Sequence, residues 1–131
     1  MRFWKNGLPI LIKNGFLKMT ALKTWISASR LRTLPLSISG TLVGSSYAYF
    51  LGFFDGFIFI LITLTTLSFQ ILSNLANDYG DGIRGTDNPS RIGPERAIQS
   101  GAVSPKQMRL AIILNAFIST GLVTVSYTHL T

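Results

Sequence analysis

Side chains that could bind a metal ion gather in one short stretch of the sequence. Four amide and carboxylate side chains in it follow one another at helical spacing: Asn74, Asn77, Asp78 and Asp81. At about 100° per residue they fall on one stripe of an α-helix. Two carboxylates one turn apart repel each other unless a cation lies between them. Oxygen ligands without His or Cys suit a hard ion, Mg²⁺ before Ca²⁺, so the stripe predicts a magnesium site.

Basic residues follow this stripe in the sequence, at Arg84, Arg91 and Arg96. Mg²⁺ commonly takes one or two protein carboxylates and completes its coordination with water and substrate phosphates. Arginine side chains can hold the phosphate oxygens that the metal leaves free. The combination predicts a metal–diphosphate site. The alternative that spacing alone leaves open is a solvated helix end, whose acids merely offset the basic charge of the loop.

The composition indicates a membrane protein. Of 131 residues, 47% are hydrophobic and 13% are charged, where soluble domains carry about 25% charged residues. The net charge is +7, but the basic residues stand in blocks beside uncharged runs, which is typical of membrane proteins. A nucleic-acid partner is not expected, because such binding needs basic residues spread over one face. The chain has no cysteine, which excludes disulfides and thiolate metal sites.

Three apolar runs without a charged residue cover residues 36–54, 57–77 and 110–127. A helix needs about 20 apolar residues to cross a bilayer. Backbone polar groups in lipid must be satisfied within the segment, so each run is expected to be a helix. The predicted fold is therefore an all-α, polytopic membrane helical bundle with three transmembrane helices.

The basic residues also predict the orientation. They are concentrated before residue 36 and in the segment 78–109, and short flanks rich in Lys and Arg stay in the cytoplasm. Both segments lie on the same side of the membrane if Asp55 and Gly56 form a tight outer hairpin. We therefore expect a cytoplasmic N-terminus and a cytoplasmic Asp-rich loop over 78–109.

Local signals predict helix boundaries and contacts. Residues Ser104 to Gln107 have the pattern of a capping box, with Pro in the first helical position, so the third helix is expected to start near Pro105. Small residues recur at every fourth position and would let another helix approach closely. They are Gly40, Gly44, Ala48 and Gly52.

The two ends of the chain suggest a fragment. Residues 1–18 do not resemble the start of a membrane enzyme, and Met19 would be a natural beginning, so an upstream or non-native extension is expected there. Residues 19–131 are expected to form the N-terminal part of a membrane domain. The sequence stops soon after the third apolar run.

Four motifs together resemble a known family. They are Arg30–Ser37, Gln70–Asp81, Gly85–Asn88 and Arg91–Arg96. Over residues 19–127 the chain resembles the UbiA superfamily of intramembrane aromatic prenyltransferases, most closely the branch that acts on 1,4-dihydroxy-2-naphthoate in menaquinone biosynthesis.

This resemblance implies a larger bundle, of which the chain holds the first three spanning helices, in the inner membrane of a bacterium. Two Asp-rich loops would hold Mg²⁺ and an isoprenyl diphosphate, and only the first is present here. Asn74, Asn77, Asp78 and Asp81 correspond to its metal motif. Where many relatives have a third Asp this chain has Gly85, so Asp87 is a possible further ligand and Tyr79 a possible substrate contact.

The resemblance also implies a reaction. A polyprenyl group would pass from polyprenyl diphosphate to 1,4-dihydroxy-2-naphthoate in a Mg²⁺-dependent step that gives demethylmenaquinone. No residue of the chain stands out as a catalytic acid or base, and the chain alone is expected to be inactive. Alternatives are another aromatic prenyltransferase of the same superfamily, or a non-enzymatic membrane assembly or transport subunit that dimerises through its glycine stripe.

Overall fold

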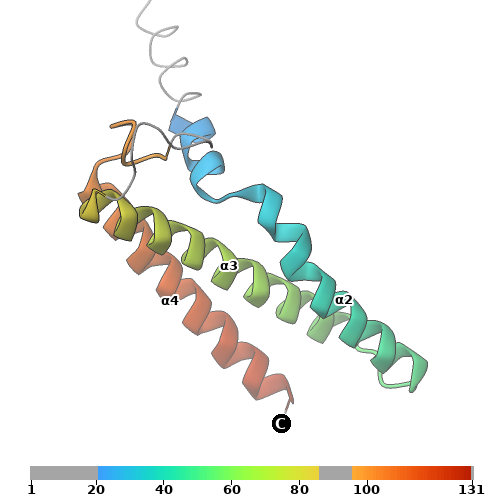
Figure 1. Cartoon of the computed structure of the whole chain (residues 1–131). Coiled ribbons are helices and arrows are strands. Elements are labelled where there is room, and N and C mark those ends of the chain that lie inside the picture. Colours follow the sequence, from blue (N-terminus) through green and yellow to red (C-terminus); the bar gives the residue numbers. More distant parts are fainter. Residues whose placement is uncertain (1–20, 86–95, 131) are drawn as a thin grey trace, which may run out of the picture.

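The computed structural model describes residues 21–85 and 96–130, and all regular elements in them are helices (Figure 1). In chain order they are the helical residues 21–28, η1 (Leu31–Thr33), α2 (Leu34–Phe50), α3 (Gly56–Arg84) and α4 (Pro105–Leu130). The described part contains no strand, which confirms the all-α prediction. The predictions for residues 1–18, Asp87 and Arg91 lie outside the described residues.

Helix α2 ends at a left-handed glycine. Gly52 has φ +80°, its N–H donates to the Tyr49 carbonyl at 3.0 Å, and the Phe53 N–H donates to the Ala48 carbonyl at 2.9 Å. These two bonds form a Schellman motif, which satisfies the last carbonyls and stops a helix. Helix α2 therefore has 17 residues and ends before the span expected over 36–54 does.

Helix α3 begins at a side-chain cap. Asp55 Oδ1 accepts hydrogen bonds from the N–H groups of Phe57 at 2.8 Å and Ile58 at 3.0 Å. The first N–H groups of a helix have no partner within the helix, and an Asp cap supplies one. The lone acid between the two apolar runs thus starts the second helix.

The same helix continues past its expected end at residue 77 and stops at Arg84, where Gly85 adopts φ +61°. The apolar run ends at residue 77, but polar residues there keep helical spacing and the backbone continues. Asp78 and Asp81 consequently lie within α3, and the loop expected over 78–109 begins only after Arg84.

Helix α4 begins as predicted. Gln107 Oε1 accepts a hydrogen bond from the Ser104 N–H at 3.0 Å, and Ser104 Oγ accepts one from the Gln107 N–H at 3.3 Å. Pro105 is the first helical residue, which confirms the capping box and the start of the third helix.

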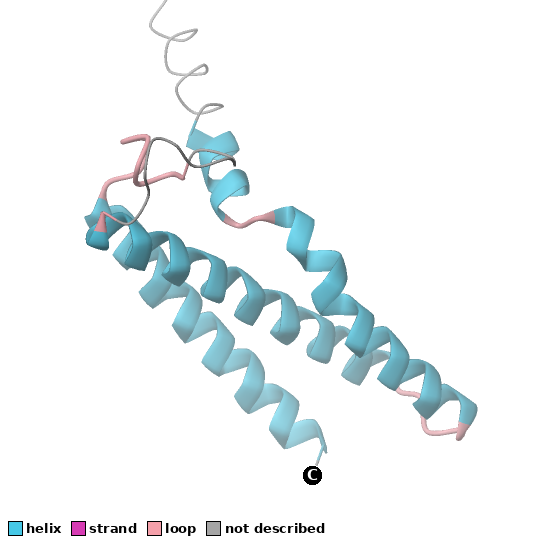
Figure 2. Ribbon diagram, in the orientation of Figure 1, coloured by secondary structure: helices cyan, strands magenta, loops and turns pink. Residues whose placement is uncertain are grey.

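Helix α3 packs against both α2 and α4 (Figure 2). Between α3 and α4, the Ser68 and Ser119 hydroxyls lie 2.9 and 3.2 Å from Asn115 Oδ1 and 2.7 Å from each other. Ser119 is only 1% exposed. Hydrogen bonds of this kind join helices in lipid, where apolar side chains give little preference for one another over lipid tails.

Between α2 and α3 the contact is looser. A methyl group at Gly40 or Gly44 would meet no atom within 4 Å beyond its own helix backbone. Both glycines line a cavity of about 380 Å³ together with Ile58 and Ile62 of α3. The close approach of another helix that the small-residue stripe predicts is therefore not made by α3 at these positions.

Helix α3 and residues Pro105–His129 of α4 are long and apolar enough to cross a membrane, and little of either is buried in the structure. Large apolar side chains are exposed along both, such as Phe57, Ile60 and Phe117. These two helices agree with the predicted membrane bundle. Helix α2, with 17 residues, is not among the spans found in the described residues, so a third span there stays a prediction.

A small apolar cluster gathers at the end of the molecule opposite Asp55. Its buried members are Ala28, Leu75, Ala97, Val103 and Met108. They come from the helical residues 21–28, α3, the turn after residue 95 and the start of α4. This cluster therefore fixes four segments around the aspartates of α3 (Figure 1).

Candidate functional site

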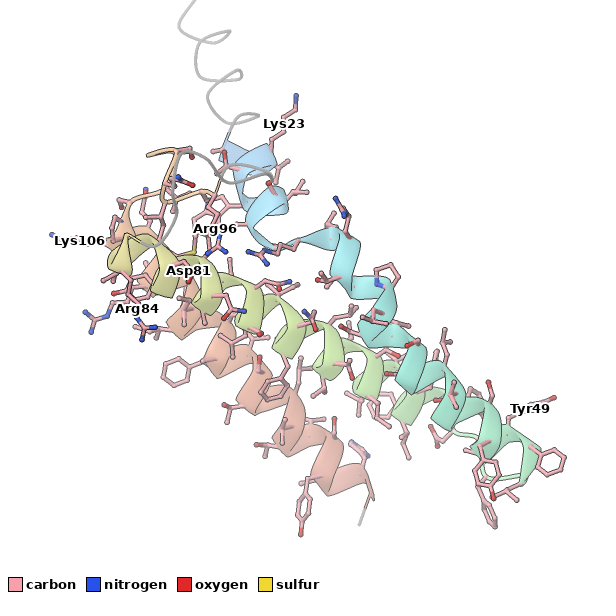
Figure 3. All side chains as sticks on the ribbon, in the orientation of Figure 1. Lys23, Tyr49, Asp81, Arg84, Arg96 and Lys106 are labelled. Atoms are coloured by element: carbon pink, nitrogen blue, oxygen red, sulfur yellow. The ribbon has the colours of Figure 1, made fainter. Side chains whose placement is uncertain are left out.

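Asp78 and Asp81 lie one turn apart near the end of α3, and Arg96 pairs with both. Figure 3 shows Arg96 and Asp81 near each other at this end of the molecule. Arg96 Nη1 forms an ion pair with Asp81 Oδ2, and Arg96 Nε lies 4.0 Å from Asp78 Oδ1. Asp78 is 3% exposed, whereas the Asp81 side chain is 38% exposed. The structure thus brings three residues predicted from the sequence into one cluster.

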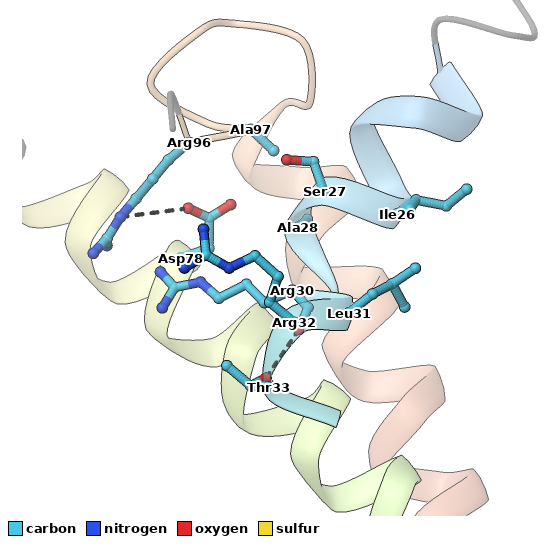
Figure 4. A pocket seen from close by; sticks show the side chains of 10 residues that line it. All are labelled: Ile26, Ser27, Ala28, Arg30, Leu31, Arg32, Thr33, Asp78, Arg96 and Ala97. Atoms are coloured by element: carbon cyan, nitrogen blue, oxygen red, sulfur yellow. Dashed lines mark hydrogen bonds and ion pairs between the residues drawn. The ribbon is translucent and has the colours of Figure 1, made fainter. Parts of the chain in front are cut away.

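A cavity of about 440 Å³ opens beside this cluster. It is lined by Asp78, Arg96 and Ala97 and by most of residues 26–33. Two further arginines, Arg30 and Arg32, reach toward α3 beside Asp78 (Figure 4). Guanidinium groups bind carboxylate and phosphate oxygens through several N–H groups in one plane. Three of them line this cavity with one carboxylate, that of Asp78, so the lining has a net positive charge that suits a polyanion.

Arg30 stands at a sharp turn between the helical residues 21–28 and η1. Its backbone has φ 49° and ψ 61°, a left-handed conformation that residues with a Cβ rarely adopt. The Thr33 N–H and the Thr33 Oγ1 both donate to the Arg30 carbonyl at 2.9 Å. Strained backbone of this kind persists only where surrounding contacts fix it, and Thr33 supplies two of those contacts.

Asn74 attaches this turn to α3. Its side-chain amide donates to the Ser29 carbonyl at 2.9 Å and to Thr33 Oγ1 at 3.1 Å, and Asn74 is 4% exposed. Gln70, one turn earlier, donates to Thr33 Oγ1 at 3.4 Å and accepts from Ser37 Oγ at 2.7 Å. The amide nitrogen of Asn74 is therefore engaged in holding the segment that carries Arg30 and Arg32.

The surroundings of Arg96 are both buried and charged. Burial lowers the pKa of the Arg96 guanidinium, the positive charge of Arg30 lowers it further, and the carboxylate of Asp78 acts in the opposite direction. Arginine remains protonated at neutral pH despite such shifts. Burial is the larger cause of the lowered pKa and repulsion from Arg30 the smaller one, and a bound anion would offset both.

Three other residues predicted from the sequence, Asn77, Tyr79 and Arg84, do not line the cavity. Asn77 is exposed on α3. Arg84 is exposed at the last residue of α3 and points away from Arg96 (Figure 3). Tyr79 packs against the apolar cluster. Asp87 and Arg91 are outside the described residues.

Arg30 and Arg32 are cavity residues that the sequence analysis did not assign to the site. Basic residues before an apolar run also set the orientation of a protein in the membrane. In the sequence, that role alone was enough to explain Arg30 and Arg32. The signal that could have distinguished them is their place immediately before Thr33 and Pro35, where a turn rather than a continuous helix is expected.

The carboxylates of the site fit a hard metal ion. The described residues contain no group of three or more His, Cys, Asp or Glu side chains that could hold a metal. Two carboxylates one turn apart are a typical protein share of a Mg²⁺ site that phosphate oxygens and water complete. Asp78 and Asp81, one turn apart on α3, fit that share.

Comparison with known proteins identifies the family of the chain. The profile of the UbiA prenyltransferase family matches residues 37–131. The chain belongs to this family. It is similar to 1,4-dihydroxy-2-naphthoate octaprenyltransferase of Escherichia coli (strain K12), at 42% identity over 92 residues, which is 70% of this chain and 30% of that protein.

Proteins of the same name from two further organisms are also similar to this UbiA chain. The Haemophilus influenzae protein is 44% identical over 95 residues, covering 71% of this chain and 31% of its own length. The Mycobacterium leprae protein is 34% identical over 102 residues, covering 78% of this chain and 34% of its own length. The chain thus spans about a third of the length of these relatives. No solved structure matches it.

Family membership confirms the resemblance drawn from the sequence motifs. UbiA prenyltransferases of this kind are integral membrane proteins that generally use a divalent metal ion, and α3 and α4 are helices of suitable length and apolarity.

Proposed function

We propose that this chain forms the diphosphate-binding part of an enzyme that transfers a polyprenyl group from polyprenyl diphosphate to 1,4-dihydroxy-2-naphthoate, releasing diphosphate and CO2 and giving demethylmenaquinol, the hydroquinone form of demethylmenaquinone. The observation that carries the proposal is that Arg96, which pairs with both aspartates of α3, lines one cavity together with Asp78, Arg30 and Arg32. The names of the relatives support the acceptor. The activity belongs to the whole protein, and the chain alone has no turnover, because three helices cannot enclose a polyprenyl substrate.

Transfer of the prenyl group requires stabilisation of the charges that develop during the reaction. Breaking the allylic C–O bond leaves negative charge on the departing diphosphate and positive charge on the prenyl carbon, which the electron-rich naphthoate ring then attacks before its carboxylate is lost. Arg30, Arg32 and Arg96 hold the diphosphate oxygens where that negative charge develops. Donors fixed in advance around a developing charge lower the barrier most effectively.

Mg²⁺ is the divalent ion proposed here. Asp78 and Asp81 would supply its carboxylates, and the exposed Asn77, on the predicted stripe, would be a further oxygen ligand. When bound, the ion adds positive charge beside the leaving diphosphate. We assign Asn74 to the support of the turn that carries Arg30 and Arg32, because its side-chain amide already donates hydrogen bonds to Ser29 and Thr33.

The proposed location is the cytoplasmic membrane of a bacterium, with the aspartate end of α3 and the N-terminus on the cytoplasmic side. The basic residues flanking the apolar helices support this orientation. Substrate diphosphate would then enter from the cytoplasm, while the prenyl chain stays in lipid.

A chimera tests the proposed function. The matching segment of the Escherichia coli relative is replaced by this chain, and demethylmenaquinone formation is measured in cells that lack the enzyme. Asp78→Ala or Asp81→Ala abolishes product, while Lys106→Ala, an exposed basic residue at the same end, leaves it near normal. Near-normal turnover in either aspartate variant would refute the assignment of the site.

A further inference from the structure

Gly82 of α3 meets the turn that carries Arg96. A methyl group at residue 82 would lie 2.7 Å from Ile98 Cγ2, 2.9 Å from Ile98 Cβ and 3.3 Å from Ile98 Cδ1. Carbon atoms attract one another best at about 3.5–4.0 Å and repel strongly at the shortest of these distances. The absence of a side chain at residue 82 is therefore what lets Ile98 sit against α3.

Ile98 and Arg96 belong to one hydrogen-bonded turn. The Ser100 N–H donates to the Arg96 carbonyl at 2.9 Å, and the Val103 N–H donates to the Ala97 carbonyl at 3.0 Å. Both bonds enclose Ile98, so a displacement of Ile98 away from α3 carries the Arg96 backbone with it.

The turn is also fixed from its inner side. Ala97 and Val103 are buried in the apolar cluster, in which Met108 of α4 is fully covered. Close-packed side chains of this kind do not absorb a shift without loss of contact. The turn therefore has one well-packed position, and Gly82 is part of what defines it.

We propose that Gly82 is a positioning residue, which sets how closely Arg96 approaches Asp78 and Asp81. This inference rests on the proposed function, because it treats Arg96 as a ligand of diphosphate. Arg96 meets α3 at the turn just before Gly82, so the contact that seats the turn lies next to the ion pairs that it aligns.

Gly80 provides a matched control. It lies two residues earlier on the same helix, and a methyl group there would meet no atom within 4 Å beyond its own helix backbone. Replacement of either glycine by alanine favours the helical backbone in the same way. Only Gly82→Ala adds an atom against the Arg96 turn.

Binding of inorganic diphosphate in the presence of Mg²⁺ is measured on the 131-residue chain in lipid nanodiscs. We expect Gly82→Ala to weaken binding by on the order of tenfold, because a misplaced charge-assisted hydrogen bond loses much of its strength. Gly80→Ala should bind within about twofold of the unmodified chain. Adding Ile98→Gly to Gly82→Ala removes all three of the carbon atoms that the new methyl group would meet, and should restore most of the affinity.

Hydrogen exchange supplies a second readout that does not need the ligand. In Gly82→Ala the amides of Ser100 and Val103 should exchange faster, while those of α3 and α4 keep their protection. Equal exchange in the Gly82→Ala and Gly80→Ala variants would overturn the positioning role. So would general loss of protection in Gly82→Ala that adding Ile98→Gly does not reverse.

The two proposals fail in different ways. If Asp81→Asn binds diphosphate as well as the unmodified chain, or the unmodified chain binds none, the proposed function is wrong. If Asp81→Asn weakens binding but Gly82→Ala matches Gly80→Ala, the site stands and the positioning role of Gly82 is wrong.

Discussion

Asn74 distinguishes two accounts of the polar stripe on α3, and two substitutions separate them. If Asn74 is a metal ligand, Asn74→Asp keeps or strengthens Mg²⁺ binding and Asn74→Leu abolishes it. If Asn74 instead holds the turn that carries Arg30 and Arg32, both substitutions weaken diphosphate binding. Neither new side chain can donate to the Ser29 carbonyl and to Thr33 Oγ1.

The magnitude follows from the contacts. A neutral hydrogen bond contributes about 1 kcal/mol, and a buried group left without its partner costs about 1–3 kcal/mol. Asn74→Leu removes two donated bonds at a site that is 4% exposed, so docking of the turn on α3 should weaken by roughly 2–4 kcal/mol. Asn74→Asp also sets a carboxylate against the Ser29 carbonyl, so it should weaken docking of the turn at least as much as Asn74→Leu does.

The assay is titration of inorganic diphosphate at several Mg²⁺ concentrations, with the chain in nanodiscs. Loss of docking releases Arg30 and Arg32 from the site, so both variants should bind diphosphate about 30- to 1,000-fold more weakly, with the remaining binding still dependent on Mg²⁺. Retained affinity in Asn74→Asp together with loss in Asn74→Leu would refute the positioning role and restore Asn74 as a metal ligand.

Three further predictions concern the turn, the helix pair and the topology. Arg30→Gly and Arg30→Ala should weaken diphosphate binding equally, yet the glycine variant should be more stable to heating by about 1 kcal/mol, because φ is 49° there; equal stability would contradict the strain. Asn115→Leu removes the acceptor shared by two serines and should lower thermal stability by about 1–3 kcal/mol, whereas an unchanged melting temperature would show that this network contributes nothing. Because the chain has no cysteine, Phe53→Cys should react with an impermeant maleimide on intact cells and Ser100→Cys only after permeabilisation; the reverse pattern would invert the proposed orientation.

Features that depend on one helical turn could be predicted from the sequence. The capping box from Ser104 to Gln107 and the shared face of Asp78 and Asp81 involve residues at most four positions apart, so spacing was sufficient. The end of α2 was not predictable in this way. Gly44 continues the helix and Gly52 ends it, and only the backbone conformation distinguishes the two.

Features that depend on distant parts of the chain could not be predicted. Periodicity shows which side chains share a face, but not which segment covers that face. Asn74 bonds Ser29, which lies 45 residues earlier. Arg30 reaches the site only because the chain turns sharply at this residue before η1 and α2. The need for glycine at residue 82 comes from Ile98, which follows α3 across the loop.

Calorimetric titration of inorganic diphosphate tests most directly whether Asp78 and Asp81 bind a metal–diphosphate pair. The unmodified chain and the double variant Asp78→Asn, Asp81→Asn are compared in nanodiscs, first with Mg²⁺ and then with EDTA. We predict saturable binding for the unmodified chain with Mg²⁺ only, and none for the double variant. Equal binding by both chains under both conditions would contradict the proposed site.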